Sequence, residues 1–334
     1  MTEHRLLHKQ LKKAKISTLE DINEKNFKKL LQLIEQSYTD YDEDKKLYES
    51  KAQLSSLEFK ELNKNLSEKV EELKKINHNI QDSIEYASLM QQAILPKLSV
   101  LDNFCKESFV YWLPKDIVGG DIYFFNILDE NSILIMVIDG AGHGVSGAFL
   151  TMLVKAIEEQ IIAKIQEGKL RPSPALILEY FNISIKIMLQ QDKESQANSG
   201  FDGGVLYYNK KSNICKYAGA KTPLYIMYDD ELEVIKSDRK SVGFVRTDID
   251  QKYTEHTIPI EKNTRLYITT DGMPDQEGEN DSRYGITQFK KLILKNQNLS
   301  FTQQGASLQK SFKDFKGNCK QSDDITVIGL SLFS

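Results

Sequence analysis

Cysteine is scarce in this chain of 334 residues, and its placement suggests neither a zinc site nor a disulfide framework. The three cysteines, Cys105, Cys215 and Cys319, lie far apart and form no C-x-x-C pair. Zinc ribbons and small disulfide scaffolds both need closely spaced cysteines, so these classes of protein are excluded. We therefore expect a protein of the reducing cytoplasm.

Long apolar segments are also missing. The N-terminal stretch MTEHRLLHKQLKKAKIS is charged where a secretory signal would need an apolar run of roughly 7 to 15 residues. The longest purely apolar run, ILIMVI, is far shorter than the ~20 residues that span a bilayer. The formal net charge of -4 gives no general reason to expect a nucleic-acid partner. We expect a soluble chain with no export signal, no membrane span and no bound nucleic acid.

Proline and glycine are both absent between Asn23 and Leu95, where charged residues are dense and apolar residues recur at helical spacing. This pattern predicts a helical module at 1–95. Its second half carries a heptad repeat over about 59–94, in which nine of eleven positions are apolar or alanine. Those eleven positions are Phe59, Leu62, Leu66, Lys69, Leu73, Ile76, Ile80, Ser83, Ala87, Met90 and Ile94.

Such a coiled-coil seam would be roughly 50 Å long at the helical rise per residue. A short preceding helix cannot cover it fully, so self-association into a homodimer is the favoured interpretation. The alternative is an intramolecular hairpin in which the segment Phe27 to Tyr41 packs against the seam. Lys69 and Ser83 weaken the seam locally.

From Pro96 onward the sequence changes to short apolar runs separated by glycine, asparagine and aspartate. The expected strands are ESFVYWL, DIYFFNIL, SILIMVI, GGVLYYN, NICKYAGA, PLYIMYD, RLYITT and DITVIGLSLF. Helices are expected at about 145–166, 173–190, 286–296 and 302–315. Strands often follow one another directly, which favours an antiparallel α+β domain at 96–334 over a doubly wound parallel sheet.

A glycine pattern inside IMVIDGAGHGVSGAFL, residues 135–150, formally matches the dinucleotide-binding fingerprint G-x-G-x-x-G. Two observations argue against a nucleotide there. Asp139 would face the pyrophosphate and repel it unless a cation lay between them. The stretch that follows, KAIEEQIIAKIQEGK, continues as helix, where the fingerprint needs a second strand ending in an acidic residue.

Aspartates cluster at the predicted strand ends. Asp121 and the pair Asp323 and Asp324 stand at strand entries, and Asp139 and Asp271 stand at strand exits beside glycine. If these carboxylates meet at one mouth of a sheet, each pair would repel by roughly 1 to 4 kcal/mol at 4 Å. Cations must then offset the repulsion.

Oxygen ligands without histidine or thiolate partners suit hard divalent ions such as Mg²⁺ or Mn²⁺. The Gly140 carbonyl could add a further ligand, because glycine lets the backbone approach closely. Two ions about 3.5 to 4 Å apart could activate a shared water and clamp a phosphoryl oxygen.

The order GGDxY, DGxGHG, TDG and DDxT resembles the PPM-type (type 2C) metal-dependent serine/threonine protein phosphatases, and specifically their bacterial SpoIIE-like branch. The similarity covers about residues 84–332, including the segment SIEYASLMQQAILP. It implies a β-sandwich flanked by helices, two Mn²⁺ or Mg²⁺ ions, and a metal-bound water that attacks phosphoserine or phosphothreonine.

The resemblance also implies roles for individual residues. Asp121, Asp139 and the Gly140 carbonyl would hold one ion, Asp139 would bridge, and Asp271 with Asp323 would hold the other. Asp324 would support the ligands without binding metal.

Three further residues are candidates for supporting roles. His143 could act as a general acid, but a loop histidine hydrogen-bonded to backbone is preferred. Asp202 and Asp275 could complete a third ion site or contact substrate, but turn or cap roles are preferred for both.

We therefore expect a cytoplasmic phosphatase whose helical module regulates or dimerises the catalytic domain. Members of the family commonly act in bacterial partner-switching signal transduction, which implies a phosphorylated STAS-domain anti-sigma-factor antagonist as the substrate. The alternatives are a phosphohydrolase for nucleotides or small phosphomonoesters, and a non-catalytic scaffold that only binds its partner.

Overall fold

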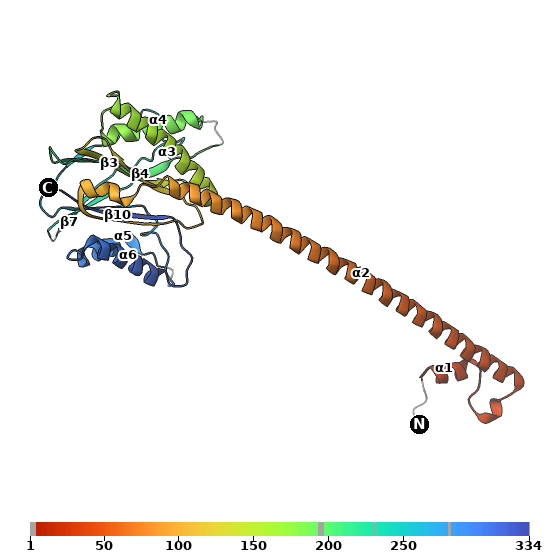
Figure 1. Cartoon of the computed structure of the whole chain (residues 1–334). Helices are drawn as coiled ribbons and strands as arrows, with labels where there is room; N and C mark the ends of the chain where they lie inside the picture. The colour runs from red at the N-terminus through yellow and green to blue at the C-terminus, as the bar shows by residue number, and fades with distance from the viewer. Residues whose placement is uncertain (1–4, 193–196, 230, 280–281, 334) are drawn as a thin grey trace. The chain divides into compact units, whose positions relative to one another are not determined.

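The computed structural model describes residues 5–192, 197–229, 231–279 and 282–333. The chain divides into two compact units, Met1–Asn79 and Ile80–Ser334 (Figure 1). None of the helices in the described ranges is both long enough and apolar enough to cross a membrane.

The first unit is helical, as the lack of proline and glycine predicted. Helix α1 (Arg5–Lys13) and the short 3-10 turn η1 (Leu19–Asp21) precede α2 (Glu24–Ala93), which runs for 70 residues without a break. The buried Gln10 side chain of α1 donates a hydrogen bond to the Leu33 carbonyl oxygen of α2, at 3.2 Å. Helix α1 falls within the expected helical module at 1–95, although its few apolar residues are embedded in lysine and arginine.

The hairpin alternative for the heptad segment is wrong. Residues 27–41 belong to the same uninterrupted helix as the heptad positions, so they cannot fold back onto them. In the single chain most seam residues are exposed to solvent: Leu62 is 65% exposed, Leu66 61% and Leu73 62%. At the end of the seam, Ala87 and Ile94 are half-buried, and Ile94 packs against the core of the second unit.

The second unit contains two five-stranded antiparallel sheets. The first sheet has the order β1-β10-β9-β6-β7 and the second the order β2-β3-β4-β5-β8. The strands are β1 (Cys105–Leu113), β2 (Asp121–Ile127), β3 (Ser132–Gly140), β4 (Phe201–Asn209), β5 (Ile214–Ala220), β6 (Leu224–Tyr228), β7 (Glu231–Ile235), β8 (His256–Pro259), β9 (Arg265–Thr269) and β10 (Ile325–Leu332). The expected α+β fold is confirmed.

Strand β3 shows why its sequence is an unbroken apolar run. Successive side chains of a strand point to opposite faces of the sheet. Ile133, Ile135 and Val137 belong to the core between the two sheets. Leu134 and Met136 belong to the core between this sheet and the helices that cover it. Because both faces of β3 are buried, no polar alternation is left in its sequence.

Helices cover the outer faces of both sheets. On one side lie α3 (Gly144–Gln166) and α4 (Pro174–Met188), and on the other side lie α5 (Gly285–Lys295) and α6 (Phe301–Lys316) (Figure 1). The start of α4 follows a helix-capping rule, because the Ser173 hydroxyl accepts a hydrogen bond from the Leu176 N–H and Pro174 occupies the first turn. A 3-10 segment, η2 (Leu98–Asn103), leads into β1.

The eight expected strands and four expected helices of this region are all present, with ends displaced by a few residues. Strands β7 and β8 were missed because ELEVI and HTIP are short and lack the long apolar runs of the central strands. The end of α2, from Ile80, belongs to the second unit, whereas the sequence analysis placed the domain boundary after residue 95. Its Gln91 side chain is 1% exposed.

Candidate metal centre

Three aspartates meet at one end of the β2-β3-β4 sheet. The strand register pairs Asp121 with Asp139, and Asp139 with Asp202. Residues directly opposite each other on antiparallel strands point to the same face. The three residues therefore lie side by side on adjacent strands.

Two more aspartates come from the other sheet. Asp271 follows the end of β9, and Asp323 precedes the start of β10. These strands are antiparallel neighbours, so the end of one lies beside the start of the other. Asp139, Asp202, Asp271 and Asp323 line a common pocket of about 210 Å³ together with the Gly140 to His143 loop and Phe244.

Asp121 does not line this pocket, although it was expected to share it. The Asp121 side chain is 1% exposed. Its Oδ2 accepts hydrogen bonds from the Thr270 and Thr326 hydroxyls, both at 2.7 Å. Thr326 lies in β10 and Thr270 directly follows β9, so Asp121 links the two sheets beside Asp139.

The carboxylates carry an unbalanced negative charge. Burial, followed by the charges of Asp121 and Asp271, raises the pKa of Asp139 well above its ordinary value. Burial and then the charge of Asp323 raise the pKa of Asp271, even though its side chain is exposed at the pocket mouth. Burial also raises the pKa of Asp121. A divalent cation would reverse these shifts.

Asp202 leaves one oxygen unsatisfied. Its Oδ2 is paired with the Lys221 ammonium at 2.9 Å, whereas its Oδ1 is buried with no hydrogen-bond partner. The preferred interpretation of Asp202 as a turn residue is wrong, because it lies within β4. A buried carboxylate oxygen without a donor fits a cation ligand or a group bridged to a cation.

The carboxylates do not form a closed ligand cage by themselves. In the part of the chain that the structure describes, no three Asp, Glu, His or Cys side chains converge closely enough to hold an ion. Mutual repulsion keeps uncompensated carboxylates apart.

Glycines let the surrounding loops approach one another closely. A Cβ atom on Gly120 would lie 2.5 Å from the carbonyl oxygens of both Gly140 and Gly142. A Cβ on Gly147 would lie 2.7 Å from the Gly120 Cα. Gly142 has a φ of +91°, a conformation that side chains rarely adopt. The glycine pattern therefore serves the packing of the Asp139 loop against the Asp121 loop.

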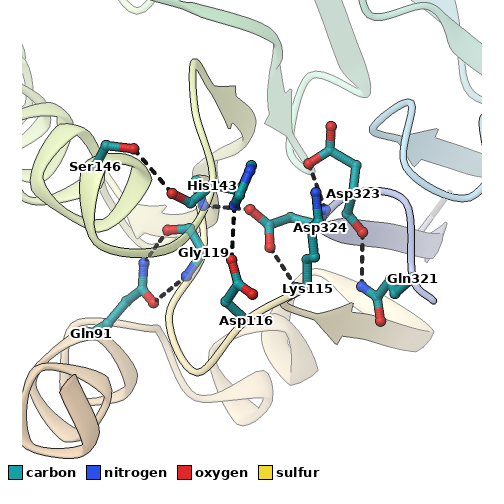
Figure 2. A network of polar contacts seen from close by, with 10 residues as sticks. Gln91, Lys115, Asp116, Gly119, His143, Ser146, Gln321, Asp323 and Asp324 are labelled. Carbon is teal, nitrogen blue, oxygen red and sulfur yellow. Dashed lines mark hydrogen bonds and ion pairs between the residues drawn. The ribbon is translucent and has the colours of Figure 1, made fainter. Parts of the chain in front are cut away.

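Asp324 organises the backbone around the pocket (Figure 2). Its Oδ1 accepts a hydrogen bond from the Lys115 N–H and its Oδ2 accepts one from the Gly120 N–H, both at 2.6 Å. Its own N–H donates to Asp323 Oδ1 at 2.8 Å. Both carboxylate oxygens are thus occupied by the loop that leads into Asp121, which favours the supporting role over a ligand role.

His143 lies at the pocket and contacts a carboxylate that the sequence analysis did not consider. Its Nδ1 is 2.8 Å from Asp116 Oδ2, and both side chains are exposed (Figure 2). The preferred interpretation, a ring hydrogen-bonded to backbone, does not match this side-chain contact. The His143 carbonyl oxygen accepts a hydrogen bond from the Ser146 hydroxyl at 3.0 Å.

Asp275 occupies the turn after β9, as preferred. Its N–H donates to the Asp271 carbonyl oxygen at 2.8 Å, and its exposed carboxylate lies 3.4 Å from the Arg283 guanidinium. Asp275 is not among the residues that line the pocket.

Gln91 is a positioning residue that the sequence analysis missed, because a single glutamine in a helix carries no signal. Its Nε2 donates to the Gly119 carbonyl oxygen at 2.7 Å and to the Thr151 hydroxyl at 3.0 Å, and its Oε1 accepts from the Gly119 N–H at 3.1 Å. The amide thus ties the loop before Asp121 to helices α2 and α3 (Figure 2).

Replacing Gln91 with alanine should weaken the metal site. Gly119 would lose both hydrogen bonds, so the Asp121 loop would be less well placed, and we expect activity or metal affinity to fall about 10- to 100-fold. The measurement is the affinity of the full-length chain for Mn²⁺, by isothermal titration calorimetry. Gln92→Ala is the matched control, because Gln92 is exposed and its side-chain amide donates to Ser88 of its own helix. Equal behaviour of the two variants would contradict this role.

Comparisons with known proteins point to one family. The sequence model described as "Stage II sporulation protein E (SpoIIE)" matches residues 129–333. The phosphoserine phosphatase RsbP of Bacillus subtilis is 23% identical over 199 residues, which cover 59% of this chain and 46% of RsbP. The chain thus matches less than half of the length of this curated relative.

Solved structures agree with this assignment. The SiaA-PP2C domain of Pseudomonas aeruginosa is 29% identical, with a TM-score of 0.69 over 77% of this chain and 98% of that domain. The PP2C phosphatase domain of SpoIIE from Bacillus subtilis, solved with a fragment of its regulatory domain, shows the same fold at 15% identity, with a TM-score of 0.52 over 69% of this chain and 62% of that one. The chain belongs to the SpoIIE family, and its second unit is a PP2C-like (PPM-type) phosphatase domain.

Proposed function

We propose that this chain is a metal-dependent protein serine/threonine phosphatase. The observation that carries the proposal is the convergence of Asp139, Asp202, Asp271 and Asp323 on one pocket, with Asp121 buried beside them. Carboxylate oxygens in this number, with Lys221 as the one cation bonded to them in the described residues, suit Mn²⁺ or Mg²⁺.

Two ions would be held as the family resemblance implies. Asp121, Asp139 and the Gly140 carbonyl oxygen would bind one, Asp139 would bridge, and Asp271 with Asp323 would bind the other. The unsatisfied Asp202 Oδ1 supports the presence of a cationic or cation-bridged group in the pocket. Two such ions lower the pKa of a shared water and offset the charge of a phosphoryl group.

The chain's own residues orient this chemistry. Thr270 and Thr326 fix Asp121, and Asp324 fixes the backbone at Gly120. Gly120, Gly142 and Gly147 let the Asp121 loop and the Asp139 loop pack closely against each other. His143, whose ring is oriented by Asp116, could hold a proton for the leaving seryl oxygen.

The proposed substrate is a phosphoserine or phosphothreonine protein, with a phosphorylated STAS-domain anti-sigma-factor antagonist as the first candidate. The similarity to RsbP, which is named a phosphoserine phosphatase, supports a phosphoprotein substrate. The STAS-type partner rests on the family resemblance alone.

We further propose a cytoplasmic homodimer formed through α2. The exposed leucines of the heptad seam support it, because an apolar stripe of this length on a helix is normally covered by a partner.

The test is phosphate release from a phosphoserine-bearing STAS-domain protein by the full-length chain. We expect release with Mn²⁺ and none with EDTA, with recovery when Mn²⁺ is restored in excess. A nucleotide present at high concentration should not compete with the phosphoprotein. Competition by the nucleotide would favour a small-molecule phosphohydrolase, and partner binding without release under any metal would favour the scaffold.

A further inference from the structure

A second cavity, lined by basic residues, lies beside the acidic pocket. Its volume is about 460 Å³, and it is lined by Lys221, Arg239, Lys240, Ser241, Arg246 and Thr247. Four of these six residues are cationic, and no acidic residue is among them. Within the described residues, no carboxylate forms an ion pair with Arg239, Lys240 or Arg246. The cavity therefore offers positive charge that the described part of the protein does not neutralise.

Two contacts join this basic cavity to the metal pocket. Lys221 lines the basic cavity, and its ammonium is 2.9 Å from Asp202, which lines the metal pocket. Arg246 also lines the basic cavity, and its guanidinium lies 5.5 Å from the ring centre of Phe244, which lines the metal pocket. An extended peptide with its phosphoserine in the metal pocket would reach the basic cavity within a few residues.

The wall of the cavity contains a polar atom without a partner. Ser241 is 2% exposed, and its hydroxyl is buried with no hydrogen-bond partner. Buried hydroxyls are almost always hydrogen-bonded, because leaving one unsatisfied is costly. Ser241 lines this cavity, and its hydroxyl is thus a buried donor that lacks a partner at the cavity wall.

The segment that carries these residues is held firmly. The Ser241 carbonyl oxygen accepts hydrogen bonds from the Tyr253 hydroxyl at 2.9 Å and from the Thr247 hydroxyl at 3.0 Å. The Lys186 ammonium of α4 donates to the Phe244 carbonyl oxygen at 2.7 Å. The backbone at the cavity is thus fixed, and the Arg239, Lys240 and Arg246 side chains that it carries are exposed.

We propose that this basic cavity is a substrate subsite that binds an acidic side chain of the phosphoprotein, a few residues from the phosphoserine. The proposal rests on the phosphatase function proposed above. The anion cannot be the phosphoryl group under attack, because that group must enter the acidic pocket where the metals would bind. A carboxylate of the same substrate is the oxyanion that the adjoining cavity can take.

The test compares two phosphoserine peptides that differ only in their flanks, one acidic and one neutral, together with p-nitrophenyl phosphate. In the Arg239→Ala/Arg246→Ala double variant we expect KM for the acidic peptide to rise about ten-fold. This is the size expected when one or two partly exposed ion pairs between enzyme and peptide are lost. The neutral peptide and p-nitrophenyl phosphate should change less than about two-fold. Lys211→Ala/Lys262→Ala is the charge-matched control, because both lysines are exposed and lie in turns at the opposite end of the sheet from Asp202.

Ser241→Ala separates binding from folding. Removing an unsatisfied buried hydroxyl should leave the melting temperature unchanged or raise it, while KM for the acidic peptide rises several-fold. A lower melting temperature with all substrates affected alike would overturn the role of Ser241 in binding.

A binding measurement without turnover separates peptide binding at the basic cavity from phosphatase activity at the metal pocket. Fluorescence anisotropy with an unphosphorylated acidic peptide reports on the cavity without turnover, and binding to the full-length chain should weaken with salt and in the double variant. Binding without phosphatase activity would support the cavity and refute the enzyme. Equal binding of acidic and neutral peptides, or competition by inorganic phosphate alone, would overturn the subsite even if the enzyme is active.

Discussion

Replacing Asp139 with asparagine is expected to lower kcat by about 10³-fold or more. Asp139 lies between Asp121 and Asp202 in the strand register and faces the pocket that Asp271 and Asp323 also line. If Asp139 bridges both ions, its loss removes several kcal/mol of transition-state stabilisation by the metals. A difference of about 1.4 kcal/mol corresponds to a ten-fold change in rate. The measurement is single-turnover phosphate release at saturating Mn²⁺.

In the absence of metal, the same substitution should stabilise the folded state. The pKa of Asp139 is raised in the folded state, so its ionised form costs folding free energy at every pH above its unfolded pKa. Asparagine removes that cost. In EDTA at neutral pH, the variant should therefore melt at a higher temperature than the unmodified chain. In excess Mn²⁺ the order should reverse, because only the unmodified chain gains stability from bound metal.

Asp129→Asn is the matched control. Asp129 lies in the turn between β2 and β3, at the other end of the hairpin from Asp139, and its Oδ1 accepts a hydrogen bond from the Asn131 N–H that asparagine can retain. Activity and metal response should be unchanged in this variant. If Asp139→Asn keeps its activity, or melts at a lower temperature in EDTA, Asp139 does not belong to a metal-compensated cluster.

The sequence predicted the fold and the acidic positions because both leave local signals. Apolar runs mark strands that are buried on two faces, as in β3, and aspartates beside glycine mark strand ends. The convergence of Asp139 and Asp271 depends instead on how the two sheets pack, because β3 and β9 lie in different sheets. The sequence could not show that Asp121 would be buried beneath the pocket, since that depends on threonines from the opposite sheet.

The remaining parts of the site depend on contacts between segments that are distant in the chain. Gln91 hydrogen-bonds to Gly119 because the end of α2 packs against the loop before Asp121. Neither segment predicts this contact by itself. Asp202 carries no local mark of function, because only the pairing of β3 with β4 places it opposite Asp139. The basic cavity is assembled from the segment after β5 and the segment between β7 and β8, whose lysines and arginines look like ordinary surface residues in sequence.

Replacing Leu66 with glutamate is expected to dissociate the proposed homodimer. Leu66 is 61% exposed in the single chain and lies near the middle of the 70-residue helix α2. A two-stranded seam would lose two buried leucines, at roughly 2 kcal/mol each, and would gain a repulsive pair of about 1 kcal/mol. Together these changes correspond to a rise in the dimer Kd of about 10³-fold or more.

Sedimentation equilibrium of the full-length chain measures this change directly. Ser67→Glu is the matched control, because it adds the same charge one residue away, outside the heptad seam. Both variants should keep their helical circular dichroism, since each replaced residue is exposed and glutamate is a good helix former. An unmodified chain that stays monomeric at tens of micromolar would refute the dimer. Equal association of the two variants would show that any dimer forms through another surface, because only position 66 lies on the apolar stripe that the seam would bury.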